Sequence, residues 1–554
     1  MEDKLETVVQ ELQSTEFLNI VRTFLEFLKS CFGPRGGIKI LVSSGGISFV
    51  SSSSSRVLNN HIISHPLCTF VSQVMNSQTM MFGDNGLYTG ILTMSLLERS
   101  LKESEITQSQ TQHLIQGLSS QIHYLLEMNS IKLKLDFSTV TQFLPIVKAI
   151  LSSKPSCGLN NKELEKLSVQ IIKVFLNTIN DDFGDIMIMN VNDLLETTVL
   201  NGILYQIDIE EKFVQDFVEV VTDKLQKKIP LLLFDIMLTD TKNELEEVTE
   251  EGCTLLKEAV FVFECAVKIG VKIIACQKVV HQSLRLLLQR NGILLMDRLG
   301  SELCGTVEKM SGAKPISSLK NTTVKTLRSC LGSVDSVKFI RFGSKPFVVL
   351  EKNSTNTASL LLCCSNEEAF VELKLITRQA LKALRQVTCQ PFVLPGAGCL
   401  EMWLATQLRV QDTSDPAKRV LEKTAIGWLQ KSFITISALL ETSDKCMAAD
   451  TAYCHNWNSW DPDLSSSCRC GLVKADDVKA AGGSWVQPNQ FSINDLVFPL
   501  PNQFNKHPLH PNRIHEAAVV DVHISKRNAI KLALETCVNI LSIGFVVYKS
   551  PINF

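Results

Sequence analysis

The chain has 554 residues, of which 45% are hydrophobic and 20% are charged, and its formal net charge is −2. This length exceeds what one hydrophobic core supports and predicts several domains, while the near-neutral charge excludes a protein that binds nucleic acid through a basic surface. The first residues are acidic and form no apolar segment of the signal-peptide type, so we expect the 17 cysteines to be mostly buried, reduced thiols of a cytosolic protein.

The N-terminal quarter is predicted to be helical. Apolar residues at helical spacing over 21–28 indicate a first helix that ends at Gly33-Pro34. A short strand follows over 38–42, and the serines at 51–55 indicate a turn or loop. Apolar residues at helical spacing resume after Gly86, and helical segments continue to about residue 150.

The middle of the chain changes to a strand period. Short apolar runs over 271–276 and 292–297 flank a helical stretch over 281–290, which predicts a βαβ unit with a parallel sheet. Two further runs around Gly343-Ser344 predict a β-hairpin, and residues 359–364 a strand. We therefore expect an α/β domain in the interior of the chain.

Helical patterns return in the C-terminal part. A helix is predicted over 367–386, a turn over 394–398, and further helix to about residue 440. Residues 450–512 are rich in Pro, Gly, Asn and Ser and are interpreted as long loops. The amphipathic stretch over 524–542 predicts a last helix.

A series of short motifs resembles the group II chaperonins in the same order along the chain. The motifs are FGPRGGIKILV (32–42), HPL (65–67), GDNGL (83–87), ILSSKPS (150–156), ETTVLNGIL (196–204), IIACQKVVHQSL (273–284), LPGAG (394–398) and LALETC (532–537). SSKPSC (152–157) and CRCGL (468–472) further resemble the divergent McKusick–Kaufman/Bardet–Biedl chaperonin-like branch of that family.

This resemblance implies an α+β multidomain fold, that of a group II chaperonin subunit. A helical equatorial domain would be split between the termini (1–148 and 396–554, with a loop-rich insertion at about 450–512). A small intermediate domain would comprise 149–200 and 355–395, and an α/β apical domain 201–354.

The resemblance also implies a nucleotide pocket, and part of its motifs is kept. The matching residues are Gly33, Pro34, Gly36, Gly83, Asp84, Gly86, Gly396 and Gly398, with Asp84 at the Mg²⁺-binding position. Glycine is also what any tight turn needs. The residues alone therefore leave open whether these turns bind a nucleotide or only form the fold.

Other parts of the implied pocket are missing. Leu87 stands where the family has a threonine, and an isobutyl group cannot donate a hydrogen bond to a phosphate oxygen. Ser53 and Gln379 stand where the family has aspartates, and glutamine carries no charge and accepts no proton at neutral pH. We therefore predict a degenerate site without ATPase activity; weak binding of ATP or ADP with Mg²⁺ stays open, and no cofactor is required.

By resemblance, the function is that of a chaperonin-like assembly factor. That branch works with related chaperonin-like proteins and the cytosolic chaperonin ring to stabilise BBSome subunits for ciliogenesis and ciliary trafficking. It is found in the cytoplasm, the centrosome or pericentriolar material, and the ciliary basal body. The alternative is an ATP-dependent protein-folding chaperonin subunit. Neither alternative involves nucleic acid or membrane insertion.

Cysteines and a histidine gather in the predicted loop region. They are Cys454, His455, Cys468 and Cys470. The adjacent Cys454-His455 pair and the single residue between Cys468 and Cys470 do not match the usual C-x₂₋₄-C spacing of zinc sites. The sequence therefore favours a loop of reduced cysteines over a zinc-dependent scaffold.

Overall fold

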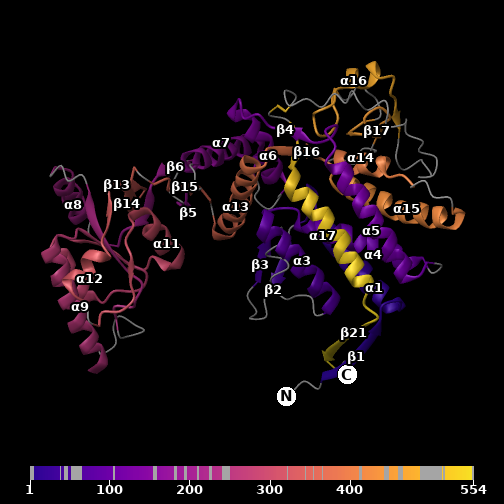
Figure 1. Ribbon diagram of the computed structural model, residues 1–554. Helices are drawn as coiled ribbons and strands as arrows, with labels where there is room; N and C mark the ends of the chain where they lie inside the picture. The colour runs from indigo at the N-terminus through magenta and orange to yellow at the C-terminus, as the bar shows by residue number, and fades with distance from the viewer. Residues whose placement is uncertain are drawn as a thin grey trace. The chain divides into compact units, whose positions relative to one another are not determined.

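The computed structural model describes residues 5–551 except 38, 43–47, 52–64, 104–105, 154–158, 180–183, 192–195, 209–210, 224–227, 240–249, 321, 344, 354, 365, 411–414, 442–447, 460–465, 487–513 and 516–517. The chain forms two compact units (Figure 1). Unit 1 comprises residues 1–169 and 371–554, and unit 2 comprises residues 170–370. The finer division into equatorial, intermediate and apical segments stays a prediction.

Unit 1 is built mainly from helices. They are α1 (Thr15–Ser30), α3 (Pro66–Phe82), α4 (Gly86–Lys102), α5 (Gln108–Leu126), the 3-10 helix η1 (Val140–Phe143), α6 (Leu144–Ser152), α14 (Cys399–Gln407), α15 (Pro416–Leu439), α16 (Ala475–Ala480) and α17 (His523–Leu541). Helices α7 (Asn161–Thr178) and α13 (Glu367–Cys389) cross the boundary between the units in sequence. The predicted helices near 21–28, after Gly86, over 367–386 and over 524–542 are confirmed.

Helix α4 lies at the centre of unit 1. Its first 12 residues are all buried, and α1, α3, α15 and α17 pack around it. A helix covered on all sides needs small or apolar residues all round, and α4 has no charged residue before Glu98. The same buried core continues into α5 and α14.

Besides the sheet of the predicted loop region, three small sheets belong to this unit. β1 (Leu5–Glu11) pairs antiparallel with β21 (Phe545–Pro551), and β2 (Lys39–Val42) pairs with β3 (Ser48–Ser51). The third sheet has the order β20 (Val520–Val522), β16 (Phe392–Pro395), β4 (Leu133–Lys134). The predicted strand over 38–42 is confirmed by β2, whereas the prediction that the first segment is helical is wrong for β1, because its pairing partner lies at the other end of the chain.

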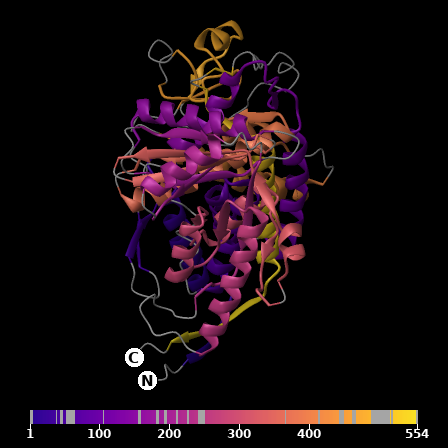
Figure 2. The same cartoon turned by 90° about the vertical axis from the view of Figure 1, so that its left-hand side faces the viewer.

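The predicted loop region is partly ordered. A three-stranded sheet has the order β18 (Asn456–Trp457), β17 (Ala448–Asp450), β19 (Trp485–Val486), and α16 packs beside it. We call residues 448–486 the insertion. Figures 1 and 2 show it at the end of unit 1 opposite to β1 and β21. The interpretation of 450–512 as loops is wrong for these short elements, whereas residues 487–512 lie outside the described chain.

Unit 2 contains the predicted parallel sheet. Its strands are β8 (Ile229–Phe234), β9 (Ile273–Cys276), β10 (Leu294–Met296) and β11 (Pro315–Ile316), in the order β10-β9-β8-β11, and β12 (Gly332–Val334) pairs antiparallel with β8. Helix α10 (Gln282–Arg290) connects β9 to β10, which confirms the predicted βαβ unit.

Alternate residues of these strands enter two separate cores. Leu231 and Leu233 face α8 (Glu211–Asp223) and α11 (Gly300–Ser311), whereas Leu232 and Phe234 face α9 (Glu250–Ile269), α10 and α12 (Val324–Ser329). Burial on both faces explains why the strands appear in sequence as continuous apolar runs.

The rest of unit 2 consists of two three-stranded sheets. The first has the order β13 (Ser336–Phe342), β14 (Lys345–Glu351), β7 (Ile203–Gln206), and its hairpin is the predicted one. The second has the order β5 (Ile186–Asn190), β15 (Ala358–Leu362), β6 (Thr198–Asn201).

Candidate functional site

A pocket of about 270 Å³ lies within unit 1, at the place where the predicted glycine turns meet. Its walls come from the turn after α1, the turn between α3 and α4, the end of α6, the middle of α13 and the start of α17. The insertion adds Asn458 and Arg469. The motifs that resemble a nucleotide site therefore do converge on one pocket.

The predicted glycines shape this pocket through backbone conformation. Gly33 has φ +76°, and a Cβ there would lie 2.4 Å from the Leu439 carbonyl oxygen. Gly83 has φ +82° and ends α3. At Gly33 this close approach excludes a side chain, and at Gly83 the positive φ strains any other residue. The turns are thus required by the fold whether or not a nucleotide binds.

The eight predicted binding residues divide into two groups. Gly33, Pro34, Asp84 and Gly86 line the pocket. Gly36, Gly83, Gly396 and Gly398 are not among the lining residues and lie in the adjoining turns. Their role in binding a nucleotide stays a prediction.

The three replaced positions differ in what the structure places there. Leu87, in the first turn of α4, is buried and lines the pocket, so its isobutyl group occupies the wall. Gln379, on α13, is also buried and lines the pocket with an uncharged amide. Ser53 lies outside the described residues. At both described positions the wall holds a side chain without charge.

Three of the hydroxyl groups that line the pocket donate to backbone carbonyls three or four residues earlier in the chain. The Ser152 hydroxyl donates to the Ala149 carbonyl (3.2 Å), and the Ser153 hydroxyl to the Ile150 carbonyl (2.7 Å). The Thr79 hydroxyl likewise donates to the carbonyl four residues earlier in α3. Phosphate oxygens need hydrogen-bond donors. These three hydroxyls therefore do not replace the hydroxyl of the family's threonine, which Leu87 lacks.

A lysine and two carboxylates at the pocket pair with one another. Lys526 of α17 lies 2.9 Å from carboxylate oxygens of both Glu401 and Asp521, and its ammonium lies 3.9 Å from the centre of the Tyr88 ring. Burial alone would lower the pKa of Lys526, but the charges of Asp521 and Glu401 outweigh burial and raise the pKa above its usual value. Lys526 is thus a structural cation that is already neutralised.

This network limits what the pocket offers to Mg²⁺. Among the described residues that line the pocket, Asp84 and Asp521 carry carboxylates. Asp521 is engaged with Lys526. Mg²⁺ in phosphate sites is usually held by one or two carboxylates together with the phosphates and water. Asp84 alone would therefore hold Mg²⁺ only weakly, and only together with a bound phosphate chain.

Arg469 enters the pocket from the insertion. It lies 3.0 Å from the carboxylate of Glu441, and its Nε donates to the Asn458 side-chain oxygen at 3.1 Å. Sequence reasoning missed Arg469 and Lys526 as pocket residues. The flanking Cys468 and Cys470 were the signal that Arg469 belongs to an ordered segment.

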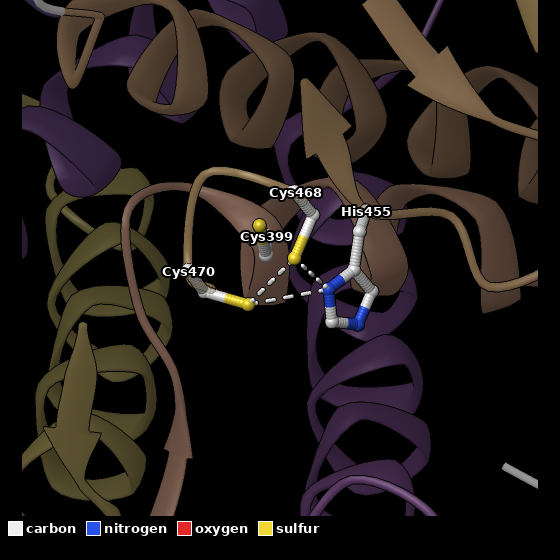
Figure 3. A group of neighbouring side chains, drawn as sticks. All are labelled: Cys399, His455, Cys468 and Cys470. Atoms are coloured by element: carbon white, nitrogen blue, oxygen red, sulfur yellow. Dashed lines mark hydrogen bonds between the residues drawn. The ribbon is translucent and has the colours of Figure 1, made fainter. Parts of the chain in front are cut away.

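The sulfur and imidazole groups of the insertion are arranged differently from the prediction. His455, Cys468 and Cys470 do come together, but the fourth member of the cluster is Cys399, at the start of α14 (Figure 3). Cys454 is not part of the cluster, because its thiol hydrogen-bonds with Thr406 instead. Cys454, which precedes His455 in the chain, was therefore wrongly grouped with these residues, and Cys399 takes its place in the cluster.

The chain is similar in sequence to known chaperonins. The TCP-1/cpn60 chaperonin family matches residues 24–443. The chain is 31% identical to the molecular chaperone MKKS of Homo sapiens, over 82% of this chain and 85% of that protein, and 29% identical to MKKS of Mus musculus, over 98% and 99%. It is 25% identical to thermosome subunit alpha of Sulfolobus acidocaldarius, over 70% and 72%.

These matches confirm the resemblance to chaperonins and to the McKusick–Kaufman branch. The mixture of helices and strands agrees with the predicted fold class. None of the helices in the described part of the chain has the length and apolar character that a bilayer crossing requires. With the family model covering most of its length, the chain belongs to the TCP-1/cpn60 chaperonin family.

Proposed function

We propose that this protein is a chaperonin-like assembly factor that holds client proteins without an ATP-driven cycle. The observation that carries the proposal is the pocket wall, where Leu87 and Gln379 supply neither the hydroxyl nor the carboxylate that phosphoryl transfer needs. Losing one such group typically lowers a catalysed rate by about 10²–10³-fold. Any ATP or ADP that binds would do so weakly, through Asp84 and the backbone amides of the glycine turns.

Exposed apolar side chains of unit 2 support a holding role. Phe261 on α9 is 58% exposed, Leu286 on α10 is 45% exposed, and Val324 on α12 is 39% exposed. Helices α10 and α12 both pack against α9. Large apolar side chains left in water on neighbouring helices suit contact with unfolded or partly assembled clients.

The proposed clients are subunits of the BBSome, and the proposed co-workers are related chaperonin-like proteins and subunits of the cytosolic chaperonin ring. Their site of action would be the cytoplasm, the pericentriolar material and the ciliary basal body. This part of the proposal rests on the resemblance to the McKusick–Kaufman/Bardet–Biedl branch, to which the MKKS relatives add support.

Affinity purification from ciliated cells tests this function. The wild-type chain should recover cytosolic chaperonin subunits together with BBSome subunits. The double substitution Phe261→Ser and Leu286→Ser should lower BBSome recovery at least about tenfold, since two exposed apolar contacts are lost. Asp84→Ala should leave both recoveries unchanged, because no nucleotide cycle is used.

The control is Tyr124→Ser with Val420→Ser, which removes exposed apolar side chains (71% and 65% exposed) from helices of unit 1. This control should retain the BBSome subunits. Recovery of neither class of partner by the wild-type chain, or loss of both on Asp84→Ala, would contradict the proposal.

A further inference from the structure

Four metal-ligating side chains converge inside unit 1 from three separate segments. Cys399 opens α14, His455 immediately precedes β18, and Cys468 and Cys470 belong to the following turn. Their ligand atoms all lie within 4.8 Å of one another, and Figure 3 shows the side chains gathered around a common space. All four residues are at least 97% buried.

The distances suit a small tetrahedral ion. His455 Nδ1 lies 3.4 Å from Cys468 Sγ and 3.3 Å from Cys470 Sγ, and the two sulfur atoms lie 3.2 Å apart (Figure 3). Bond lengths of about 2.3 Å to sulfur and 2.0–2.1 Å to nitrogen place the ligand atoms of tetrahedral zinc about 3.5–3.8 Å apart. Shifts of a few tenths of an ångström would bring these three atoms to that spacing, and Cys399 Sγ lies within 4.8 Å of them.

The chemistry of the cluster suits a cation. All four side chains are buried, and their ligand atoms lie against one another. A thiolate is the form of cysteine that binds metal. A bound dication would offset the negative charge of thiolates formed at this buried place.

The backbone around the cluster is built to hold these ligands. The Val473 amide donates to Cys468 Sγ at 3.3 Å, and the Gly471 amide donates to the Cys468 carbonyl at 2.9 Å, with Gly471 at φ +75°. The His455 amide donates to the buried carboxylate of Asp450 at 2.9 Å. Such supporting hydrogen bonds orient the groups that bind a metal.

We propose that Cys399, His455, Cys468 and Cys470 bind one zinc ion in a closed, structural site. Three thiolates and one imidazole in a tetrahedral arrangement favour zinc over hard cations such as Mg²⁺ or Ca²⁺. The ion joins α14 of the helical body to the insertion. It also fixes the position of Arg469, which lies between two of its ligands and lines the pocket. This inference does not depend on the proposed holding function.

Metal analysis of the full-length chain, purified without a polyhistidine tag and exhaustively desalted, tests the site. The wild-type protein should contain about one equivalent of zinc, whereas Cys468→Ser and Cys470→Ser should contain less than about a tenth of an equivalent. The matched control is Cys454→Ser, which removes a buried thiol next to His455 and should keep the zinc. His455→Cys should also keep the zinc, because four thiolates form an accepted zinc site.

A second measurement on the wild-type chain does not depend on the folding of any variant. Titration with a thiol-specific mercurial should release the zinc in step with modification of the cluster cysteines. Replacement by Co²⁺ should give the intense visible bands of tetrahedral coordination and thiolate-to-cobalt charge transfer. Wild-type protein with less than about a tenth of an equivalent of zinc would overturn the proposal. So would a disulfide among the three cluster cysteines, another metal in the site, or loss of zinc in Cys454→Ser alone.

Discussion

Replacing Lys526 with methionine is expected to lower the free energy of unfolding of unit 1 by about 3–5 kcal/mol, the usual cost of removing one partner of a buried ion pair. Lys526 is 3% exposed, and its partner Glu401 is fully buried. Without the ammonium, the Glu401 carboxylate must either stay charged in an apolar interior or take up a proton. Methionine fills a similar volume, so the loss measures the electrostatic network and not a cavity.

Tryptophan fluorescence during urea unfolding measures this loss selectively. All five tryptophans belong to the 371–554 segment of unit 1, so the signal does not report on unit 2. The matched control is Lys531→Met on the same helix. Lys531 lies 3.7 Å from Glu535, and both side chains are about half exposed, so about 0–1 kcal/mol is expected. Adding Glu401→Gln to Lys526→Met should recover part of the loss, and equal losses for Lys526→Met and Lys531→Met would contradict the network.

The second large effect is expected for Asp450→Ala, which should release the insertion. The buried carboxylate of Asp450 accepts the backbone amides of Tyr453, Cys454 and His455 as well as the indole N–H of Trp457. Each donor left unsatisfied inside a protein costs about 1–3 kcal/mol, so the four donors predict a local loss of at least about 4 kcal/mol. Amide hydrogen exchange in peptides from residues 448–486 should then accelerate at least about 100-fold.

The control for this prediction is Asp136→Ala in an exposed loop. The Asp136 carboxylate accepts the amide and hydroxyl of Ser138 and the side-chain amide of Gln142, so the hydrogen bonds are similar in kind. The two Ser138 donors lie next to water, which replaces the lost acceptor, and only the Gln142 amide belongs to a buried residue. Exchange near residue 136 should change far less. A comparable acceleration at both places would show that burial of Asp450 is not the cause.

The sequence was sufficient where local pattern and packing agree. The strands over 271–276 and 292–297 are confirmed because parallel strands covered on both faces need continuous apolar residues. The turns at Gly33 and Gly83 meet at one pocket. Both glycines have positive φ angles and belong to motifs that resemble those of the chaperonins, so tight turns could be expected there from the sequence. Local residue pattern thus predicted most elements, whereas the expected place of the pocket came from the resemblance to the chaperonins.

The sequence was insufficient where the deciding partner lies far along the chain. Cys399 has no nearby ligand in sequence, so the sequence grouped Cys454 with His455, Cys468 and Cys470 and, because their spacing is not that of a zinc site, favoured reduced cysteines. Lys526 belongs to an amphipathic helix, and only the carboxylates of Glu401 and Asp521 explain its burial. The pairing of β1 with β21 likewise joins the two ends of the chain. Such contacts depend on tertiary structure, which periodicity does not encode.

The central claim is that the pocket keeps its shape but has lost the groups that cleave ATP. Steady-state phosphate release at saturating Mg–ATP tests this claim most directly, with the wild-type chain compared with Asp84→Ala and Gln379→Ala. The account predicts no release above background from the wild-type chain and no change in either variant. A wild-type rate that either substitution lowers by about 100-fold or more, the usual effect of losing a catalytic group, would contradict it.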